Sequence, residues 1–509
     1  MDEILIGYEG MTLQDLVTIA RHGTGVRLSG GSQKRIAATR KLVEQWVKDE
    51  KTIYGVTTGF GALSDVAISK KDTRQLQENI LMSHAAGVGE CLSEEVVRAI
   101  MALRIKDMAR GHSVIRLETV RFLVDLLNGN VCPVVPAKGS VGASGDLAPL
   151  AHLSLPLIGR GEVFYEGHRI GAGEALKKCG LKSIQLDAAE GLALVNGTQV
   201  MTAIGALAVF DAVNLAKHTD VAAAMSLEVL MGSRTEFDSR IHQVRPHPGQ
   251  NAVADNMQRI TQNSDIITSH QDCERIQDAY TLRCSPQVHG ASRDAIYYTR
   301  QVLETEMNSS TNNPLIFHES QDFLLGGNFH GQPVGLAMDF LCMAVSELAN
   351  ISERRIERLV NPMLSGLPAF LVSDGGLNSG FMIAQYTAAA LVSENKVLSH
   401  PASVDSIPTS ANKEDHVSMG TISARKCRDI VKNTEDVIAI ELLCAAQALD
   451  LFTNLKPGEG TLEAYRVIRE EVSHLDSDRI LSEDFAAMET LLRSGKILEA
   501  VEKKVGKLR

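Results

Sequence analysis

The sequence is poor in aromatic residues and in proline. Phe, Tyr and Trp make up only 4% of its 509 residues, and 14 prolines stand against 41 glycines. A chain with few helix breakers and few large rings favours long helices rich in Ala, Leu and Met, separated by glycine-bearing loops. With 44% hydrophobic residues the chain is able to bury a large core, which excludes disordered and fibrous classes.

The sequence also lacks any cysteine pairing pattern. Its eight cysteines stand singly, without a C-x-x-C pair or the ligand spacing of a zinc site. Neither a disulfide scaffold nor a structural zinc site is indicated, so the thiols are expected to be reduced. No metal and no external cofactor are expected.

No long run of basic residues occurs, and 62 acidic residues outnumber 51 basic ones, for a net charge of −11. This balance argues against nucleic acid or an anionic membrane as the main partner and favours a small metabolite. The first residues are acidic where a secretory signal would be basic, so a cytoplasmic location is expected. The uncharged stretch 192–210 contains Asn196 and predicts a helix buried in a core rather than a membrane span.

No internal repeat or low-complexity linker divides the chain. We expect a mixed region over 1–195, in which strand-like pieces such as 162–165 are few, and a bundle of long helices over 196–509. Between 335 and 359, apolar residues recur at i+3/i+4 spacing, which predicts an amphipathic helix. The same pattern predicts helices at 197–231, 379–398, 416–452 and 482–504. The expected fold class is therefore mainly α, with a smaller mixed N-terminal region.

The tripeptide Ala143-Ser144-Gly145 is suited to a reaction of the chain with itself. If the amide nitrogen of Gly145 attacks the carbonyl carbon of Ala143, a five-membered ring closes, and loss of water, including the Ser144 hydroxyl, leaves an exocyclic alkene. Ala143 is small enough for this approach, Ser144 supplies the leaving hydroxyl, and Gly145 has no Cβ to shield its nitrogen. Asp146 is placed to shuttle protons during ring closure. The product would be an electrophile made from the chain.

Residues 139–152 (GSVGASGDLAPLAH) resemble the signature of the aromatic amino-acid ammonia-lyase family, whose members form 4-methylidene-imidazol-5-one (MIO) there. Further segments resemble the active-site segments of that family, in the same order: 54–61 (YGVTTGFG), 196–198 (NGT), 277–283 (QDAYTLR), 327–331 (GNFHG) and 410–416 (SANKEDH). The resemblance implies an ammonia-lyase/fumarase-like bundle of long helices and MIO formed from residues 143–145. It also implies a homotetramer whose active sites each take segments from more than one subunit.

The resemblance further implies roles for single side chains. Tyr54 is the expected base that removes the β-hydrogen, with Tyr280 as the close alternative. Arg283 is expected to bind the substrate carboxylate through its planar guanidinium group, and Asn196 to hydrogen-bond the carbonyl oxygen of MIO. Further lining of the site is expected from Gln277, Asn328 and Phe329. Whether MIO captures the amino group or the ring of the substrate stays open.

Substrate choice is expected to depend on Ser83-His84. Histidine-specific members of the family resemble Ser-His at this position, whereas tyrosine enzymes carry His-Leu and phenylalanine enzymes carry Phe-Leu. His84 is able to hydrogen-bond an imidazole, and Glu414 to pair with an imidazole or an ammonium group. We therefore expect non-oxidative deamination of L-histidine to trans-urocanate and ammonia, the first step of histidine catabolism. Lys413 stands where histidine enzymes more often have glutamine, which leaves the placement of Glu414 open.

Alternatives remain within and outside this class. A tyrosine or phenylalanine ammonia-lyase is disfavoured by His84 and Glu414, but no residue excludes an aminomutase that returns ammonia to the β-carbon. A metal-dependent hydrolase would have to use His152, His330 and His416 together with those two side chains. No H-E-x-x-H motif and no dense ligand spacing support that hypothesis.

Overall fold

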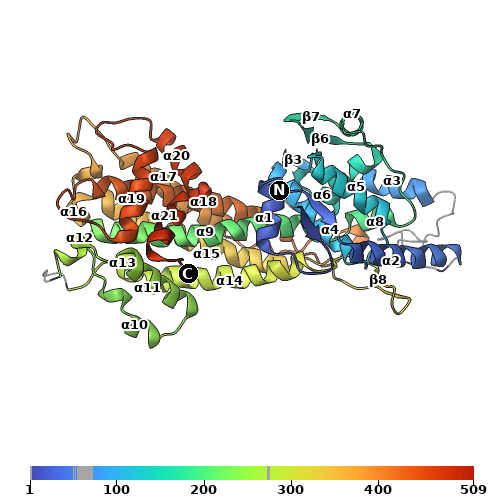
Figure 1. Ribbon diagram of the computed structural model, residues 1–509, viewed down its shortest axis with the longest axis horizontal. Helices are drawn as coiled ribbons and strands as arrows, with labels where there is room; N and C mark the ends of the chain where they lie inside the picture. Colours follow the sequence, from blue (N-terminus) through green and yellow to red (C-terminus); the bar gives the residue numbers. More distant parts are fainter. Residues whose placement is uncertain (1–2, 50, 52, 54–72, 272–275) are drawn as a thin grey trace. The chain divides into compact units, whose positions relative to one another are not determined.

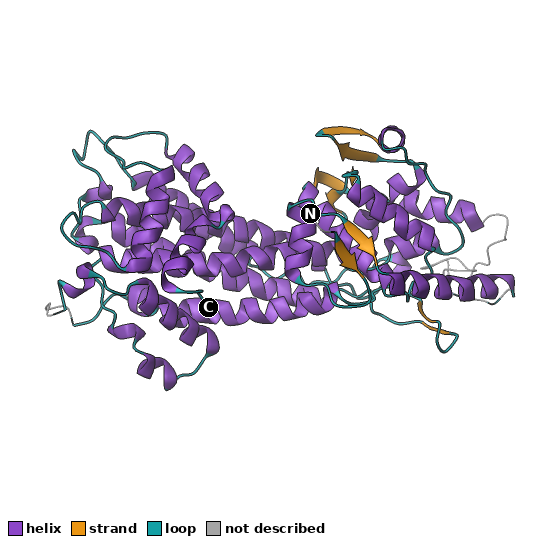
Figure 2. Ribbon diagram, in the orientation of Figure 1, coloured by secondary structure: helices purple, strands orange, loops and turns teal. Residues whose placement is uncertain are grey.

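The computed structural model describes residues 3–49, 51, 53, 73–271 and 276–509. Within this part, helices form most of the regular structure and the strands are short (Figures 1 and 2), so the expected mainly helical fold is confirmed. The predicted active-site loop at 54–61 lies outside the described residues. The chain divides into two compact units, which are described separately. Unit 1 comprises Met1–Phe210, Arg300–Asp339 and Pro401–Arg425, and unit 2 comprises Asp211–Thr299, Phe340–His400 and Lys426–Arg509.

Four long helices contribute residues to both units. They are α9 (Gln199–Val229), α14 (Ser285–Met307), α15 (Gln332–Val360) and α18 (Gly420–Leu449). Three of them match the helices expected at 197–231, 335–359 and 416–452. The two consecutive regions expected at 1–195 and 196–509 stay a prediction.

Unit 1 contains the strands of the described part, in four small sheets. Strand β1 (Ile4–Ile6) pairs in parallel with β2 (Val26–Leu28), and the other pairs are antiparallel: β3 (Val88–Cys91) with β5 (Pro136–Lys138), β6 (Glu162–Tyr165) with both β4 (Cys132–Pro133) and β7 (His168–Gly171), and β8 (Leu315–Phe317) with β9 (Asp322–Leu324). Its helices are α1 (Leu13–Arg21), α2 (Gly30–Lys48), α3 (Thr73–His84), α4 (Glu94–Ala109), α5 (Leu117–Asn128), α6 (Leu147–Ser154), η2 (Leu155–Ile158), α7 (Ala172–Lys178), α8 (Glu190–Val195) and η5 (Ser410–Asn412).

Helix α4 is the central helix of unit 1, because residues 96–109 are all buried. Its charged side chains are compensated inside the unit, as buried charges must be. Arg98, for example, donates hydrogen bonds to the backbone carbonyls of Ile19 on α1 and Leu127 on α5, both at 3.1 Å. The core on which the candidate site rests therefore contains buried, hydrogen-bonded cations as well as apolar side chains.

In the described part of unit 2, all the regular secondary structure is helical. Besides the shared helices it contains η3 (Thr235–Phe237), α10 (Ser239–Gln243), α11 (Pro248–Ile260), α12 (Asp265–Thr268), α13 (Tyr280–Arg283), α16 (Pro362–Ser365), η4 (Ala369–Leu371), α17 (Met382–Leu398), α19 (Glu459–Glu471), α20 (Leu481–Ser494) and α21 (Lys496–Val505). Helix α21 buries Ile497, Val501 and Val505, which recur at i+4 spacing, and it packs on α19.

Two expected helices are interrupted by glycine. The helix predicted at 482–504 is wrong as a single element, because Gly495 has φ +73° and separates α20 from α21. The single helix predicted over 192–210 is also wrong, since α8 ends at Val195 and α9 begins at Gln199. Gly197, between them, has φ +141°. A residue with a Cβ rarely adopts such values, so each glycine ends the helical pattern that its neighbours would continue.

Two helices of the described part, α9 and α15, are long and apolar enough to cross a membrane. Most of the apolar window is buried inside the protein, 78% in α9 and 67% in α15. Burial against other protein segments accounts for this hydropathy, and the two are core helices.

An ion pair between α15 and α18 lies in the interior of unit 2. The Arg355 Nε is 2.5 Å from Glu441 Oε1, and both side chains are fully buried. The hydroxyl groups of Ser226 (2.7 Å) and Ser352 (2.5 Å) donate to the same carboxylate. The charge of Glu441 is thus fully compensated, and loss of either partner would leave an isolated buried charge.

We expect Glu441→Gln to lower the free energy of unfolding by about 3–5 kcal/mol, because it leaves Arg355 buried without a counter-charge. Glu463→Gln, which removes the partly exposed pair with Arg466 in the same unit, should cost less than about 1 kcal/mol. Urea unfolding followed by circular dichroism measures both. Equal losses in the two variants would contradict a special role of the buried pair.

Candidate active site

The backbone of residues 144–146 is clamped against the turn between α8 and α9. The N–H of Asp146 donates to the carbonyl of Gly197 (2.7 Å), and the N–H of Gly197 donates to the carbonyl of Ser144 (3.2 Å). Gly145 and Gly197 form a parallel β-bridge between these bonds. Gly145 has φ +75°, and a Cβ on it would lie 2.0 Å from the Gly197 carbonyl oxygen. Only glycine fits this position.

The carboxyl group of Asp146 is fully buried at the start of α6 and joins two further helices. One oxygen accepts the N–H groups of Val200 (3.0 Å) and Met201 (2.9 Å) in the first turn of α9. The other accepts the hydroxyl groups of Thr421, on α18, and Ser140 (3.2 Å). Burial raises the pKa of this carboxyl to about 6, against the lowering effect of these hydrogen bonds. Asp146 is therefore able to take up and release a proton near neutral pH.

Glu414 points at the hydroxyl of Ser144. The Ser144 Oγ donates to Glu414 Oε1 at 3.3 Å, and Thr409 Oγ1 donates to the other oxygen of Glu414 at 2.8 Å. Thr409 and Glu414 also pair through their backbones, which closes the loop around η5. Lys413 is exposed beside it. The carboxylate expected from the sequence therefore lies at the serine of the tripeptide.

Asn196 follows α8 directly and is only 3% exposed. Its side-chain oxygen has no hydrogen-bond partner among the described residues. Arg104, fully buried on α4, holds both flanks of this position, because it donates to the carbonyl of Ala193 and to the side-chain oxygen of Gln199 (2.8 Å). A rigid support thus presents an unsatisfied amide oxygen one residue before the bridge to Gly145. Such an atom usually costs about 1–3 kcal/mol, which favours a partner at this point.

A cavity of about 190 Å³ lies beside the tripeptide. One wall is formed by Ser83, His84 and Ala86, and the other by side chains from 139–148. Ser83 Oγ is 3.1 Å from His84 Nδ1. Burial lowers the pKa of His84, while a hydrogen bond to the Ile80 backbone and the charge of Glu414 raise it. The cavity has room for a small molecule rather than for one or two waters.

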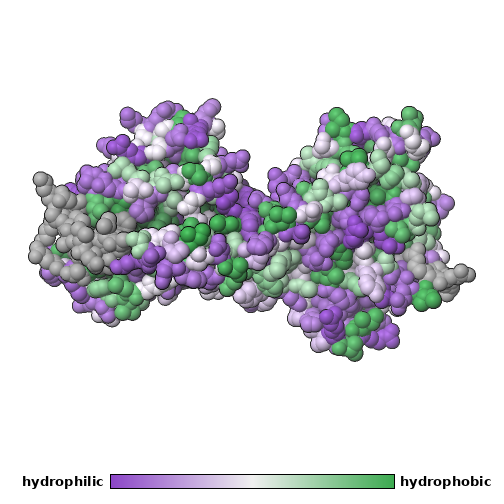
Figure 3. All heavy atoms as spheres, turned by 180° about the vertical axis from the view of Figure 1, so that it is seen from behind, coloured by the Kyte–Doolittle hydropathy of each residue, from purple (hydrophilic) through white to green (hydrophobic). Residues whose placement is uncertain are grey.

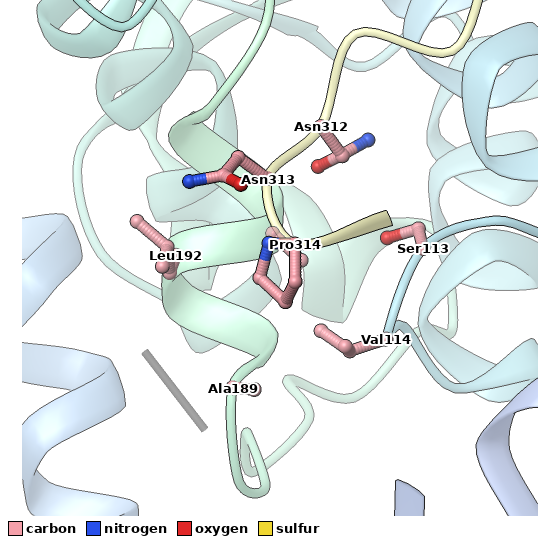
Figure 4. Close-up of a pocket in the computed structure, with 8 residues that line it drawn as sticks. Ser113, Val114, Ala189, Leu192, Asn312, Asn313 and Pro314 are labelled. Atoms are coloured by element: carbon pink, nitrogen blue, oxygen red, sulfur yellow. The ribbon is translucent and has the colours of Figure 1, made fainter. Parts of the chain in front are cut away.

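A second cavity, of about 10 Å³, is lined by α8 and by the loop 312–314 (Figure 4). Leu192 of α8 faces Pro314 across it in this view. Its volume is that of about one water molecule, too small for an amino acid. Of these two cavities, only the one lined by Ala143 and Gly145 has room for an amino acid.

The loop after β9 carries Asn328 and Phe329. Asn328 is exposed and its side-chain amide donates to the carbonyl of Ser310 (3.2 Å). Neither residue lines the 190 Å³ cavity in the described part. The next residue, His330, stacks on His416 with ring centroids 5.4 Å apart, which connects this loop to the segment that carries Glu414.

The other expected site residues belong to unit 2, except Tyr54, which lies outside the described residues. Tyr280 begins α13 and is 72% exposed, and the guanidinium of Arg283 lies 5.1 Å from the centre of its ring. Gln277 is also exposed, three residues before Tyr280. These side chains form a polar surface group of unit 2 that faces solvent in the single chain.

A sequence model of the family described as "Aromatic amino acid lyase" matches residues 11–470. The chain belongs to this family. The resemblance expected from the segments around residues 139–152 is therefore confirmed.

Relatives in the lyase family match the chain over its full length. Histidine ammonia-lyases of Alkaliphilus oremlandii and Caldanaerobacter subterraneus subsp. tengcongensis are 56% and 55% identical, and each match covers 99% of both chains. The crystal structure of histidine ammonia-lyase from Trypanosoma cruzi has a TM-score of 0.92 at 43% identity, covering 99% of this chain and 95% of that one. A tyrosine aminomutase from Streptomyces globisporus has a TM-score of 0.95 at 36% identity over 100% of both chains.

The family resemblance did not point to the groups that support this lyase site. Thr421 on α18 binds the Asp146 carboxyl, and Arg104 holds the Asn196 turn. No pattern identifies them, because a hydroxyl in an amphipathic helix and an arginine among apolar residues are common. His330 and His416 both lie within segments that resemble the family. The sequence could therefore have indicated that these two histidines lie close together.

Gly145→Ala should destabilise the fold by several kcal/mol, because its methyl group would collide with the Gly197 carbonyl and φ is positive. Gly167→Ala is the matched control, since Gly167 has φ +77° but nothing lies within 4 Å of the added Cβ. That change should cost only about 1 kcal/mol. Chemical unfolding of both variants compares them, and a Gly145→Ala protein as stable as the control would contradict the close approach.

Proposed function

We propose that the chain is a carbon–nitrogen lyase that converts L-histidine to trans-urocanate and ammonia, the opening step of histidine catabolism. The observation that carries the proposal is the placement of His84 on the wall of the cavity that Ala143 and Gly145 also line, with Glu414 at the Ser144 hydroxyl and close enough for its charge to raise the pKa of His84. A carboxylate and an imidazole flanking a serine suit a substrate with its own imidazole. The names of the full-length relatives support the same substrate.

The tripeptide fits the formation of MIO. In that reaction the Gly145 nitrogen bonds to the Ala143 carbonyl carbon, whose oxygen leaves as water, and Ser144 loses its hydroxyl with its α-hydrogen as a second water. The left-handed φ of Gly145 is a feature of this chain that suits the group. MIO supplies an electrophile that turns a poor leaving group into a better one.

Asp146 and Asn196 have separate tasks in this proposal. The Asp146 carboxyl, whose pKa burial raises to about 6, moves protons while the ring closes. The side-chain NH2 group of Asn196 would donate to the carbonyl oxygen of the ring and stabilise charge there. Both groups are buried, so water competes little with them.

His84 and Glu414 select the substrate. Burial lowers the pKa of His84, so its imidazole is neutral at neutral pH and exchanges a hydrogen bond with the substrate imidazole. Glu414 pairs with the substrate imidazole or its ammonium group. A phenyl ring would offer a hydrogen bond to neither side chain, which disfavours it as a competing substrate.

The remaining roles fall to residues that do not line this cavity in the described part, three of them in unit 2. Tyr54 or Tyr280 removes the β-hydrogen, and Arg283 binds the carboxylate through two parallel hydrogen bonds. Further lining comes from Gln277, Asn328 and Phe329. We propose a homotetramer in which one subunit supplies the Tyr280 group to the cavity of another. The exposure of Tyr280 in the single chain supports this arrangement.

Helix α17 supports oligomer formation. It is an apolar helix of 17 residues, yet only Ala384, Ala388 and Asn395 are buried. Ile383 and Tyr386 are 51% and 60% exposed, and Val397 is 67% exposed. Large apolar side chains are also exposed outside α17. Figure 3 shows hydrophobic residues in green on one face of the molecule. A second copy that covers α17 would remove this surface from water, as closed symmetric oligomers do.

The chain is a soluble enzyme, and we place it in the cytoplasm. The apolar helices α9 and α15 are accounted for by core burial. The seven cysteines in the described part are free thiols, which suits a reducing compartment.

An aminomutase is the alternative within the family, supported by the fold shared with tyrosine aminomutase. His84 and Glu414 favour histidine over tyrosine. A metal-dependent hydrolase loses support, because the described residues contain no group of three or more His, Cys, Asp or Glu side chains arranged to hold a metal ion.

Ultraviolet absorbance on mixing the protein separately with L-histidine, L-tyrosine and L-phenylalanine tests the function, since each conjugated product absorbs at its own wavelength. We expect a rise with histidine alone, and none with Ser144→Ala, which lacks the leaving hydroxyl. A rise with tyrosine or phenylalanine instead would overturn the assignment of His84 and Glu414. If none of the three amino acids gives a rise, the same mixtures would be tested for mutase products.

Tyr386→Asp should dissociate the tetramer, because a carboxylate cannot be buried without a partner in the α17 interface. Turnover should fall at least roughly tenfold, since isolated subunits lack the Tyr280 group. Ile480→Asp, at a position also exposed (65%) but outside α17, is the control and should leave both unchanged. Size-exclusion chromatography with light scattering reports the mass. A fully active monomer would contradict shared active sites.

A further inference from the structure

A hydrogen bond connects the two walls of the proposed substrate cavity. The backbone N–H of Gly87 donates to Nε2 of His152 at 3.1 Å. Gly87 lies three residues after His84, on one wall. His152 lies on α6, the helix that begins directly after the tripeptide of the other wall. The contact therefore joins the backbone next to His84 to the helix next to Ser144.

The walls touch closely around this bond. A Cβ on Gly87 would lie 3.2 Å from His152 Nε2 and 3.2 Å from Pro136 Cβ. A Cβ on Gly139, which has φ +131°, would lie 3.2 Å from the Gly87 Cα. The positive φ of Gly139 favours glycine there, and at Gly87 a side chain would force its neighbours to shift by a few tenths of an ångström, so the two walls are closely packed at this point.

Hydrogen bonds hold the short segment between His84 and Gly87, so a shift of Gly87 would also move His84. The N–H of Ala86 donates to the carbonyl of His84 at 2.7 Å, and that of Ala85 donates to Leu81 of α3 at 3.1 Å. Val88, on the other side, pairs with Lys138 in the β3–β5 sheet. Gly87 is thus the point where this turn meets α6.

The hydrogen bond defines the state of the His152 ring. A backbone N–H only donates, so Nε2 must accept, and the proton of the neutral imidazole resides on Nδ1. Burial lowers the pKa of His152, which keeps the ring neutral. The expected catalytic chemistry uses no other property of this side chain.

We propose that His152 is a positioning residue: by accepting the Gly87 N–H it sets the separation between His84 and the 143–145 tripeptide, and hence the fit of the substrate imidazole. It acts through Gly87 and does not touch the substrate. The inference rests on the proposed function, since it concerns how histidine is held in the same cavity.

Replacing the acceptor tests the inference through the separation of KM from kcat. His152→Leu removes the acceptor, and the KM for L-histidine should rise roughly tenfold while kcat stays within about twofold. His152→Gln offers an amide oxygen to Gly87 and should restore KM to within about twofold of the wild type. If leucine prevents folding, His152→Ala removes the acceptor without adding bulk and should show the same rise.

Controls separate positioning from general damage. His168→Leu makes the same change at an exposed histidine of β7 and should leave KM unchanged. Mass spectrometry of the active-site peptide should show the loss of two waters in every variant, so that ring formation is intact. A wild-type KM in the leucine and alanine variants, or a glutamine variant as impaired as leucine, would overturn the role of His152. A wild type that makes no urocanate would instead overturn the proposed function.

Discussion

The close approach of Gly145 to Gly197 is the constraint on which the site depends. Two glycine backbones meet there because no side chain fits between them. The contact brings the start of α6 beside the start of α9, and the Asp146 carboxyl then accepts N–H groups from the first turn of α9 and a hydroxyl from α18. Residues 144–146 are thus held by backbone and buried polar groups.

Burial of this turn determines the protonation of Asp146. A carboxyl group without access to water favours its neutral form, so the pKa of Asp146 rises to about 6, into the range where a proton is easily exchanged. Glu414 reaches Ser144 from a segment 270 residues away in the sequence. The site therefore combines a buried acid next to the tripeptide with a carboxylate that accepts a hydrogen bond from its serine.

Much of this architecture could be predicted from local pattern. The helix expected at 335–359 is α15, and the helix expected at 379–398 is α17, because apolar spacing directly reflects which face is buried. The pattern failed at Gly197 and Gly495, where the flanking residues remain helical in character but the glycine adopts positive φ. The distribution of α9, α14, α15 and α18 over two units was likewise beyond a reading along the chain.

The sequence by itself determined the family, the helical class and the reactive tripeptide, because these are encoded in contiguous residues whose order and spacing carry the chemistry. It also pointed to His84 and Glu414 as a pair. Only the tertiary structure decided which groups support the site. Thr421 binds Asp146, Arg104 lies behind Asn196, and His152 accepts the Gly87 N–H. Those partners are separated by up to 275 residues. Their hydrogen bonds form only when packing excludes water, and no local spacing records that event.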